Sequence, residues 1–288
     1  MKIEELLGTP IVIMVSSGKG GVGKTTTVVN ISRELSRRGY KTLIVSMDWG
    51  QNNVSLHYNV NPTIGEDIFE SDTIPLAHKV KTLCDNLSLL QAPITYRQCD
   101  ISIDWMDDML NTALEEGYQY VILDSPTNVE QGFYACARVC DIPIWVTTSD
   151  RLSITGTDIA SGIFNTINDD VGVEYDGVLY KNSNISHPPY VIVNRVESTN
   201  SINNKLHNMV KTLNMNIIGI IPVDDKSIGI LNHGDVLNIE KGGTLSAISR
   251  IIDRLLGKSL IPTIDDMVNY VYPTNNRVLR FIANILHL

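Results

Sequence analysis

The sequence has few cysteines, and they form no recognisable metal-binding or disulfide pattern. The four cysteines, Cys84, Cys99, Cys136 and Cys140, include no Cys-x-x-Cys pair, which argues against a structural zinc site. Their small number also argues against a disulfide scaffold and favours a reducing cytoplasm. Cys136 and Cys140 are spaced like neighbours on one face of a helix, and we expect both in the core.

The sequence also lacks long hydrophobic runs and an excess of basic residues. No stretch approaches the ~20 apolar residues of a spanning helix, and Ile11–Val15 is too short for the hydrophobic part of a signal peptide. The 23 Lys and Arg against 32 Asp and Glu give a formal net charge of -9, which disfavours a nucleic-acid coat. What is present is 43% hydrophobic residues in a chain of 288, enough for one well-buried α/β domain.

Short β-branched runs alternate along the chain with longer helical patterns. Because most runs are almost continuously apolar, we expect strands that are covered on both faces. The alternation predicts an α/β fold with a mostly parallel central sheet and helices on both faces. The expected strands are Ile11–Val15, Thr42–Ser46, Leu87–Leu90, Tyr120–Asp124, Ile142–Thr148, Tyr190–Val193 and Ile217–Ile221. The expected helices are Thr25–Arg38, Ile103–Glu116, Leu152–Thr166, Asn200–Leu213 and Leu245–Leu256.

Residues 1–256 are expected to form one domain. The polar stretch Asn168–Pro189 predicts an excursion from the sheet that holds a small hairpin, Val173–Tyr180. Residues 257–276 are expected to be a connector with a short helix, Ile264–Tyr270, and residues 277–288 a C-terminal amphipathic helix.

A glycine-rich stretch between the first strand and the first helix carries the clearest motif. It reads Gly18-Lys19-Gly20-Gly21-Val22-Gly23-Lys24-Thr25 and matches G-x-x-x-x-G-K-[ST]. The glycines let backbone N–H groups turn toward a phosphate, and the helix adds its positive end. We expect Lys24 on the β- and γ-phosphates, Thr25 on Mg²⁺, and the backbone through Thr26 around the phosphates. The stretch therefore predicts nucleotide binding with magnesium.

Lys19 is one lysine more than this pattern needs. The sequence Lys-Gly-Gly-x-Gly-Lys-Thr resembles the deviant Walker A loop of the MinD/ParA family of ATPases. The resemblance implies the P-loop NTPase fold of that type, with ATP and Mg²⁺ as cofactors. In that family the first lysine reaches the phosphates of the ATP in the other subunit. The resemblance thus implies a homodimer when ATP is bound, with Lys19 as a catalytic residue beside Lys24 and Asp48.

The resemblance extends along most of the chain. Met47–Asn53 looks like the family's switch I, which implies that Asp48 positions the attacking water near the metal and that Asn53 lies near the γ-phosphate. Tyr120–Glu130 looks like the Walker B strand followed by switch II, which directs the carboxylate of Asp124 at the Mg²⁺ shell. The Asp-Ser-Pro sequence there is typical of the MinD branch.

Two later segments match the adenine side of the family's site. Val191–Val196 implies that Asn194 meets the base edge, with Arg195 beside it, and Gly219–Asp225 with Pro222 matches the loop that borders the adenine.

The switch regions also depart from the family's pattern. Ser55 stands where the MinD branch often has an aspartate, and Thr127 and Asn128 follow Asp-Ser-Pro in place of small residues, so partner contacts there are expected to differ. Nitrogenase iron protein and the cluster-scaffold relatives need cluster-binding cysteines, and this sequence lacks cysteines at the corresponding places. Among the relatives, the resemblance is therefore to the positioning ATPases.

The last twelve residues, Arg277–Leu288, have an amphipathic helical pattern. Apolar side chains share about half of the helical circle, and Arg277 and Arg280 lie opposite them. Such a tail resembles the membrane-targeting helix of the MinD branch and implies reversible attachment to the inner face of the cell membrane, strengthened when a dimer presents two tails. Packing onto its own domain or onto a protein partner are the alternatives.

The sequence thus predicts a slow ATPase that switches by dimerisation, positions a cellular structure in division, polarity or flagellar placement, and is stimulated by a protein partner. The alternative is a ParA-like partition ATPase that binds DNA non-specifically. Its candidate contacts, Arg195, Lys205 and Lys211, are sparse. A small-molecule kinase is a third hypothesis, without a visible acceptor site.

Overall fold

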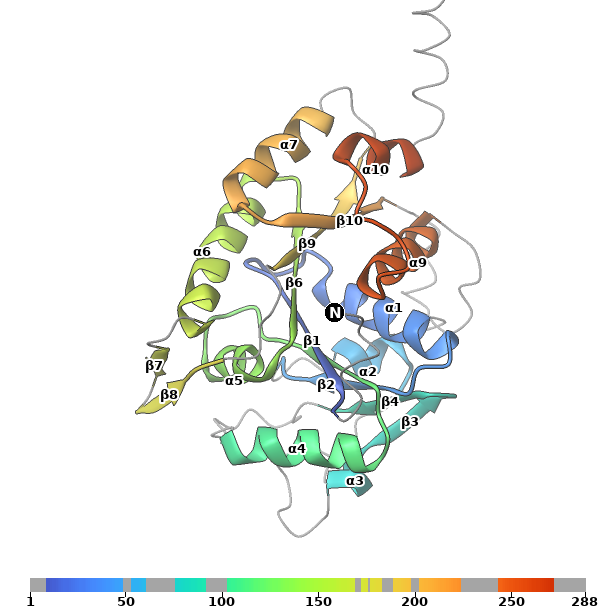
Figure 1. Ribbon diagram of the computed structural model, residues 1–288, viewed down its shortest axis with the longest axis vertical. Coiled ribbons are helices and arrows are strands. Elements are labelled where there is room, and N and C mark those ends of the chain that lie inside the picture. Colours follow the sequence, from blue (N-terminus) through green and yellow to red (C-terminus); the bar gives the residue numbers. More distant parts are fainter. Residues whose placement is uncertain are drawn as a thin grey trace, which may run out of the picture.

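The computed structural model describes residues 9–48, 53–60, 76–91, 103–168, 172–175, 177–182, 189–197, 202–223 and 243–271. Within these residues, eight strands form one sheet in the order β10-β9-β6-β1-β5-β2-β4-β3 (Figure 1). All neighbouring strands are parallel except β3, which runs antiparallel to β4. The predicted α/β fold with a mostly parallel sheet is confirmed.

The elements are as follows. The strands are β1 (Ile11–Ser16), β2 (Thr42–Ser46), β3 (Lys81–Cys84), β4 (Leu87–Leu90), β5 (Tyr120–Asp124), β6 (Ile142–Thr148), β7 (Val173–Tyr175), β8 (Val178–Tyr180), β9 (Tyr190–Val196) and β10 (Asn216–Pro222). The helices are α1 (Lys24–Arg37), α2 (Asn53–His57), α3 (Leu76–Lys79), α4 (Ile103–Glu115), α5 (Gln131–Val139), α6 (Arg151–Asn168), α7 (Ile202–Leu213), α9 (Gly243–Leu255) and α10 (Ile264–Val271).

Helices cover both faces of the sheet, and each face has its own hydrophobic core. Ile13 and Val15 of β1 belong to the core beneath α1 and α9, whereas Val12 and Met14 belong to the core beneath α4, α5, α6 and α7. This split follows from the alternation of side chains along a strand. It also explains why most of the central strands are apolar on both faces.

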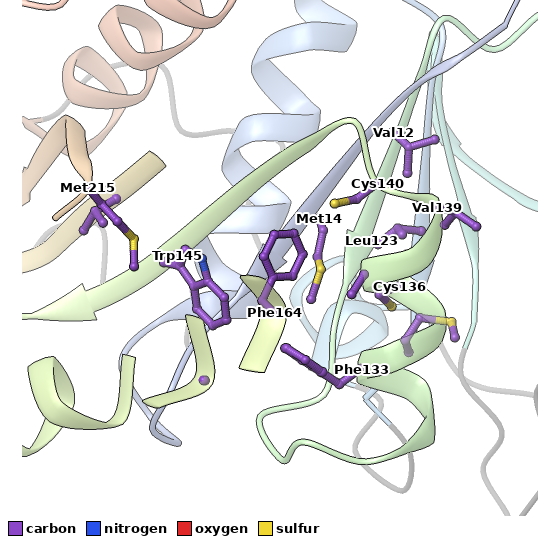
Figure 2. Close-up of a cluster of buried hydrophobic side chains, with 14 of the residues drawn as sticks. Val12, Met14, Leu123, Phe133, Cys136, Val139, Cys140, Trp145, Phe164 and Met215 are labelled. Carbon is purple, nitrogen blue, oxygen red and sulfur yellow. The ribbon is translucent and has the colours of Figure 1, made fainter. Parts of the chain in front are cut away.

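The core on the α5 and α6 side is built around aromatic rings (Figure 2). Trp145 meets Phe164 edge-on at 6.0 Å between ring centroids, and Phe133 lies 6.3 Å from Trp145. Cys136 and Cys140 are fully buried in this core, as predicted. This core fixes α6, whose N-terminus faces the glycine-rich loop.

The expected strands and helices that fall on the described residues are present, with ends within three residues of the predicted ones. The hairpin β7–β8 is separate from the main sheet, as predicted, and Tyr175 of β7 stacks on Tyr134 of α5 at 4.7 Å. Sequence reasoning missed α2, α3, β3 and α5. The first three have only four or five residues, and β3 is a partly exposed edge strand, so their periodicity is weak.

The predicted helix at residues 277–288 and Asp225 lie outside the described residues. Among the helices that the structure describes, none is long and apolar enough to span a bilayer.

Candidate nucleotide-binding site

Four of the predicted side chains meet at the carboxyl edge of the sheet. The Nζ atom of Lys24 lies 2.7 Å from Asp124 Oδ1 and 3.6 Å from Asp48 Oδ2. The Thr25 hydroxyl donates a hydrogen bond to Asp124 Oδ2 at 3.0 Å. Because β1, β2 and β5 are neighbours in the sheet, the segments that follow them converge at one place.

The glycine-rich loop has the conformation that anion binding requires. Gly21 and Gly23 have φ values of 77° and 95°, a region that residues with a side chain rarely enter. Gly23 precedes α1, whose start has no side-chain cap hydrogen bond and no acidic residue in its first turn. The first N–H groups of α1 are therefore available to a phosphate.

The charges around Asp124 fit a divalent cation. Asp124 is fully buried, and its carboxylate and that of Asp48 share the ammonium of Lys24. Burial raises the pKa of Asp48; the ammonium of Lys24 opposes this rise, and the negative charge of Asp124 adds to it. The Thr25 hydroxyl and the Asp124 carboxylate are the hard oxygen ligands that Mg²⁺ takes beside phosphate oxygens. The residues present thus fit magnesium and a nucleoside phosphate.

Lys19 lies apart from this cluster, at the exposed front of the loop. Its Nζ atom is 3.3 Å from Asp150 Oδ1, and 43% of its side chain is exposed. Asp150 precedes α6 and is held there, because its carboxylate accepts hydrogen bonds from the backbone N–H and the hydroxyl of Ser153. These bonds, together with those from Thr148 and Lys19, keep the pKa of Asp150 well below its usual range. The two lysines of the motif therefore have separate partners.

Asn194 lies behind the loop rather than open to solvent. Its Nδ2 donates to the carbonyl oxygen of Val22 at 2.8 Å, and its Oδ1 accepts from the backbone N–H of Arg195 at 2.9 Å. Only 7% of Asn194 is exposed. The side-chain amide of Asn194 still has one N–H and one lone pair that could bond the edge of the base. The contact between Asn194 and the base stays a prediction.

A hollow of about 340 Å³ opens beside the loop, next to Asn194. Its charged lining combines Lys19, Arg195 and Lys205 with Asp150 and Glu197. Two of the basic residues named as candidates for DNA contact, Arg195 and Lys205, thus lie beside acidic side chains. Pro222 ends β10 and pairs with Val196 of β9, next to this edge.

Comparison with known proteins identifies the family. Residues 13–237 match the CobQ/CobB/MinD/ParA nucleotide binding domain, a match that covers more than half of the chain. The chain belongs to this family. It carries a MinD/ParA-type nucleotide-binding ATPase domain.

Individual relatives in the family agree with this assignment. The chain is 28% identical over 257 residues to the septum site-determining protein MinD of Bacillus subtilis, covering 86% of this chain and 90% of that one. It is 29% identical over 262 residues to MinD of Synechocystis, covering 89% and 92%. The structure is similar to a chain of the MinC:MinD cell division protein complex of Aquifex aeolicus, with a TM-score of 0.71 and 27% identity over 88% of this chain and 98% of that one.

The structure also shows where the residues lie at which the switch regions depart from the family's pattern. Ser55, found where an aspartate is common in the MinD branch, lies in α2 and is buried, with its hydroxyl hydrogen-bonded by Gln91. Asn53 is the first residue of α2. Thr127 and Asn128 lie between β5 and α5, partly or fully exposed.

Sequence reasoning did not select Asp150, Gly156 or Gln91. A sequence signal for Asp150 was available. Asp150 and Ser153 form an Asp-x-x-Ser pattern before a helical stretch, which is typical of a helix start. The other two residues make tertiary contacts that no local sequence pattern indicates. The backbone of Gly156 contacts that of Gly18, and Gln91 donates a hydrogen bond to Ser55.

Proposed function

We propose that this MinD/ParA-family protein is an ATP-hydrolysing dimerisation switch that positions a cellular structure. The separation of its two loop lysines is the observation that carries the proposal. Lys24 is buried on Asp124 and Asp48, whereas Lys19 is directed away from that cluster to the exposed carboxylate of Asp150. A lysine that is exposed at the mouth of a phosphate site, and held there only by an exposed ion pair, is accessible to a nucleotide held by a second subunit.

The site residues have complementary roles in hydrolysis. Lys24 and the start of α1 bind the phosphates, while Thr25 and Asp124 hold Mg²⁺, which neutralises phosphate charge when bound. Asp48, made more basic than a free carboxylate by its burial, orients the attacking water and accepts its proton. Lys19 of one subunit stabilises the negative charge that develops on the γ-phosphate in the other.

Four further residues complete the proposed nucleotide site. Asn53 lies near the γ-phosphate, and the base side is formed by Asn194, Arg195 and Pro222. The names of the relatives point to division-site placement as the process, and the MinC:MinD title points to a protein partner that reads the nucleotide state. Hydrolysis is slow until such a partner binds.

The chain is organised for membrane attachment in this proposal. Residues 1–256 form the ATPase domain, 257–276 connect it, and 277–288 lie in the membrane surface as an amphipathic helix. One short helix of this kind binds reversibly. A dimer presents two, and the second binds at high effective concentration, so ATP controls attachment.

Co-sedimentation with anionic liposomes tests this function. The full chain and a truncation before Arg277 are compared with Mg·ATP and with Mg·ADP, and phosphate release is measured in the same samples. The proposal expects pelleting of the full chain with ATP and little with ADP or after truncation. Pelleting in neither state overturns the membrane role, and ATP-dependent binding to duplex DNA that weakens steeply with salt would assign the partition function instead. Absence of phosphate release would overturn the switch itself.

A further inference from the structure

Helix α2 is joined to the end of β4 by a buried hydrogen bond. Gln91 Nε2 donates to the hydroxyl oxygen of Ser55, and both residues are 2% exposed. Because neither atom is open to water, loss of one partner leaves the other polar group buried and unpaired. The pair therefore fixes α2 more firmly than a surface contact would.

A second contact ties the end of α2 to α1. The hydroxyl of Tyr58, the residue after α2, donates to the carbonyl oxygen of Val29 in α1 at 3.2 Å, and Tyr58 is almost fully buried. The backbone N–H of Val60 returns to the carbonyl oxygen of Ser55 at 2.9 Å. Helix α2 is thus clamped between α1, which follows the phosphate loop, and the end of β4.

Gln91 lies at the same sheet edge as the metal-site carboxylate. In the register of the sheet, Ser46 of β2 faces Asp124 of β5, and Val45 faces Leu90 of β4. The next residue after Leu90 is Gln91, so it follows β4 at the level of Ser46. Strand alternation puts Asp124 and Ser46 on the α1 face, the face to which Leu89 also belongs, and Gln91 continues that alternation.

The connection from this clamp to the reacting groups is short. Asp48 is tied to Lys24, and Asn53 begins α2. The five residue steps between Asp48 and Asn53 span at most about 18 Å when extended. Fixing α2 at Ser55 therefore limits how far Asn53 can move relative to Asp48.

We propose that Gln91 is a positioning residue for ATP hydrolysis: its hydrogen bond to Ser55 holds α2, and with it Asn53, against the sheet edge that carries Asp48 and Asp124. This rests on the proposed function of Asp48 and Asn53 in hydrolysis. Gln91 itself does not touch substrate. Its removal loosens the geometry of the attacking side while the phosphate loop, which leads into the N-terminus of α1, keeps its contacts.

The variant Gln91→Leu tests the proposal in the full chain. We expect kcat for Mg·ATP to fall about tenfold, because a misplacement of about 1 Å can cost about a hundredfold and the bond of Tyr58 to α1 still limits the displacement. The affinity for a fluorescent ATP analogue should change less than about twofold. Hydrogen exchange of the amides in α2 should also become faster without nucleotide. That readout does not depend on catalysis.

Ser55→Ala removes the same bond from the other side and serves if Gln91→Leu does not fold. The double variant should be no worse than either single one, since both break one interaction. Asn182→Leu is the matched control, because Asn182 is a buried amide that donates to Ala137 O and Cys140 O at the far end of α5. It should lower the melting temperature and leave kcat intact.

Three outcomes decide the matter. If Gln91→Leu and Ser55→Ala keep kcat within twofold of the wild type, the positioning role is wrong. If Asn182→Leu loses as much kcat as they do, the effect is general destabilisation and the role is equally wrong. If the wild-type chain does not hydrolyse ATP, the proposed function has failed, and the positioning role fails with it, a result distinct from the other two.

Discussion

The backbone of Gly156 in α6 lies directly against the backbone of Gly18 in the phosphate loop. A Cβ atom built on Gly18 would lie 1.9 Å from the carbonyl carbon of Gly156, and one on Gly156 would lie 2.3 Å from Gly18 O. Neither backbone can yield without moving its element. The position of α6 consequently fixes the position of the phosphate loop.

Gly156→Ala should therefore disturb nucleotide binding from a residue that carries no reactive group. We expect the affinity for Mg·ATP to fall at least about tenfold, because the loop must shift to admit the methyl group. Titration with a fluorescent nucleotide measures this. Gly162→Ala in the same helix is the control, since its Cβ meets nothing within 4 Å. That change should leave affinity unaltered and stabilise α6 by about 0.5–1 kcal/mol. Equal affinities for both variants would contradict the contact.

Lys24 should be structurally important even without nucleotide. Lys24→Met leaves the fully buried Asp124 without its ammonium partner, which we expect to cost about 3–5 kcal/mol of unfolding free energy. The double variant Lys24→Met, Asp124→Asn should recover much of that loss, because the fully buried charge is then gone and only the less deeply buried Asp48 lacks the ammonium. Urea unfolding of the nucleotide-free protein measures both. Additive losses would show that the two side chains do not depend on each other.

Asp48→Asn should separate stability from catalysis. Burial raises the pKa of Asp48, so its charged form is less favourable in the folded than in the unfolded chain. The stability that Asp48 contributes is present below its ordinary pKa near 4 and is lost as the pH rises through its raised pKa. The amide variant should thus be at least as stable as the wild type at pH 8, with the difference vanishing toward pH 4, while hydrolysis is lost. Thermal unfolding across this pH range, without nucleotide, checks the sign; a variant that is less stable only at high pH would refute it.

Asp150 should have two separable roles. Asp150→Ala removes the acceptor for the Ser153 N–H and should cost about 1 kcal/mol of stability, whereas Asp150→Asn keeps an acceptor and should cost little. Asp150→Asn also releases Lys19 for a second subunit. Because each exposed ion pair is worth only about 0.2–1 kcal/mol and a dimer breaks two of them, the protein concentration needed for ATP-dependent dimerisation should fall by no more than about thirtyfold.

The salt dependence provides the check on this pair. The difference between Asp150→Asn and the wild type should shrink as salt is added, since both side chains are exposed. Asp158→Asn, on the exposed face of α6, serves as the control. A gain that salt leaves unchanged would mean that release of Lys19 is not its cause.

The strands and the phosphate loop were predictable because their information is local. Ile11–Ser16 and Tyr120–Asp124 are apolar up to their last residues, and a strand buried on both faces leaves that pattern in the sequence. The loop must combine left-handed glycines with Lys24 and Thr25 at fixed spacing, so its motif is recognisable without a structure.

The supports of the site were not predictable in the same way. The contact of Gly156 with Gly18 and the bond between Gln91 and Ser55 join segments that only the sheet order brings together. Helix α5 was also missed, although Cys136 and Cys140 have helical spacing, because its nine residues give little more than two turns of pattern. Asn194 was predicted on the base edge from its motif, and its bond to Val22 required coordinates to find.

Sedimentation velocity of the full chain tests the central claim most directly. The wild type and Lys19→Ala are compared with Mg·ATP and with Mg·ADP, after nucleotide binding by both has been confirmed. The account predicts a dimer for the wild type with ATP alone, and a monomer for Lys19→Ala with either nucleotide. A wild type that stays monomeric with ATP, or a Lys19→Ala variant that dimerises and hydrolyses ATP like the wild type, would contradict it.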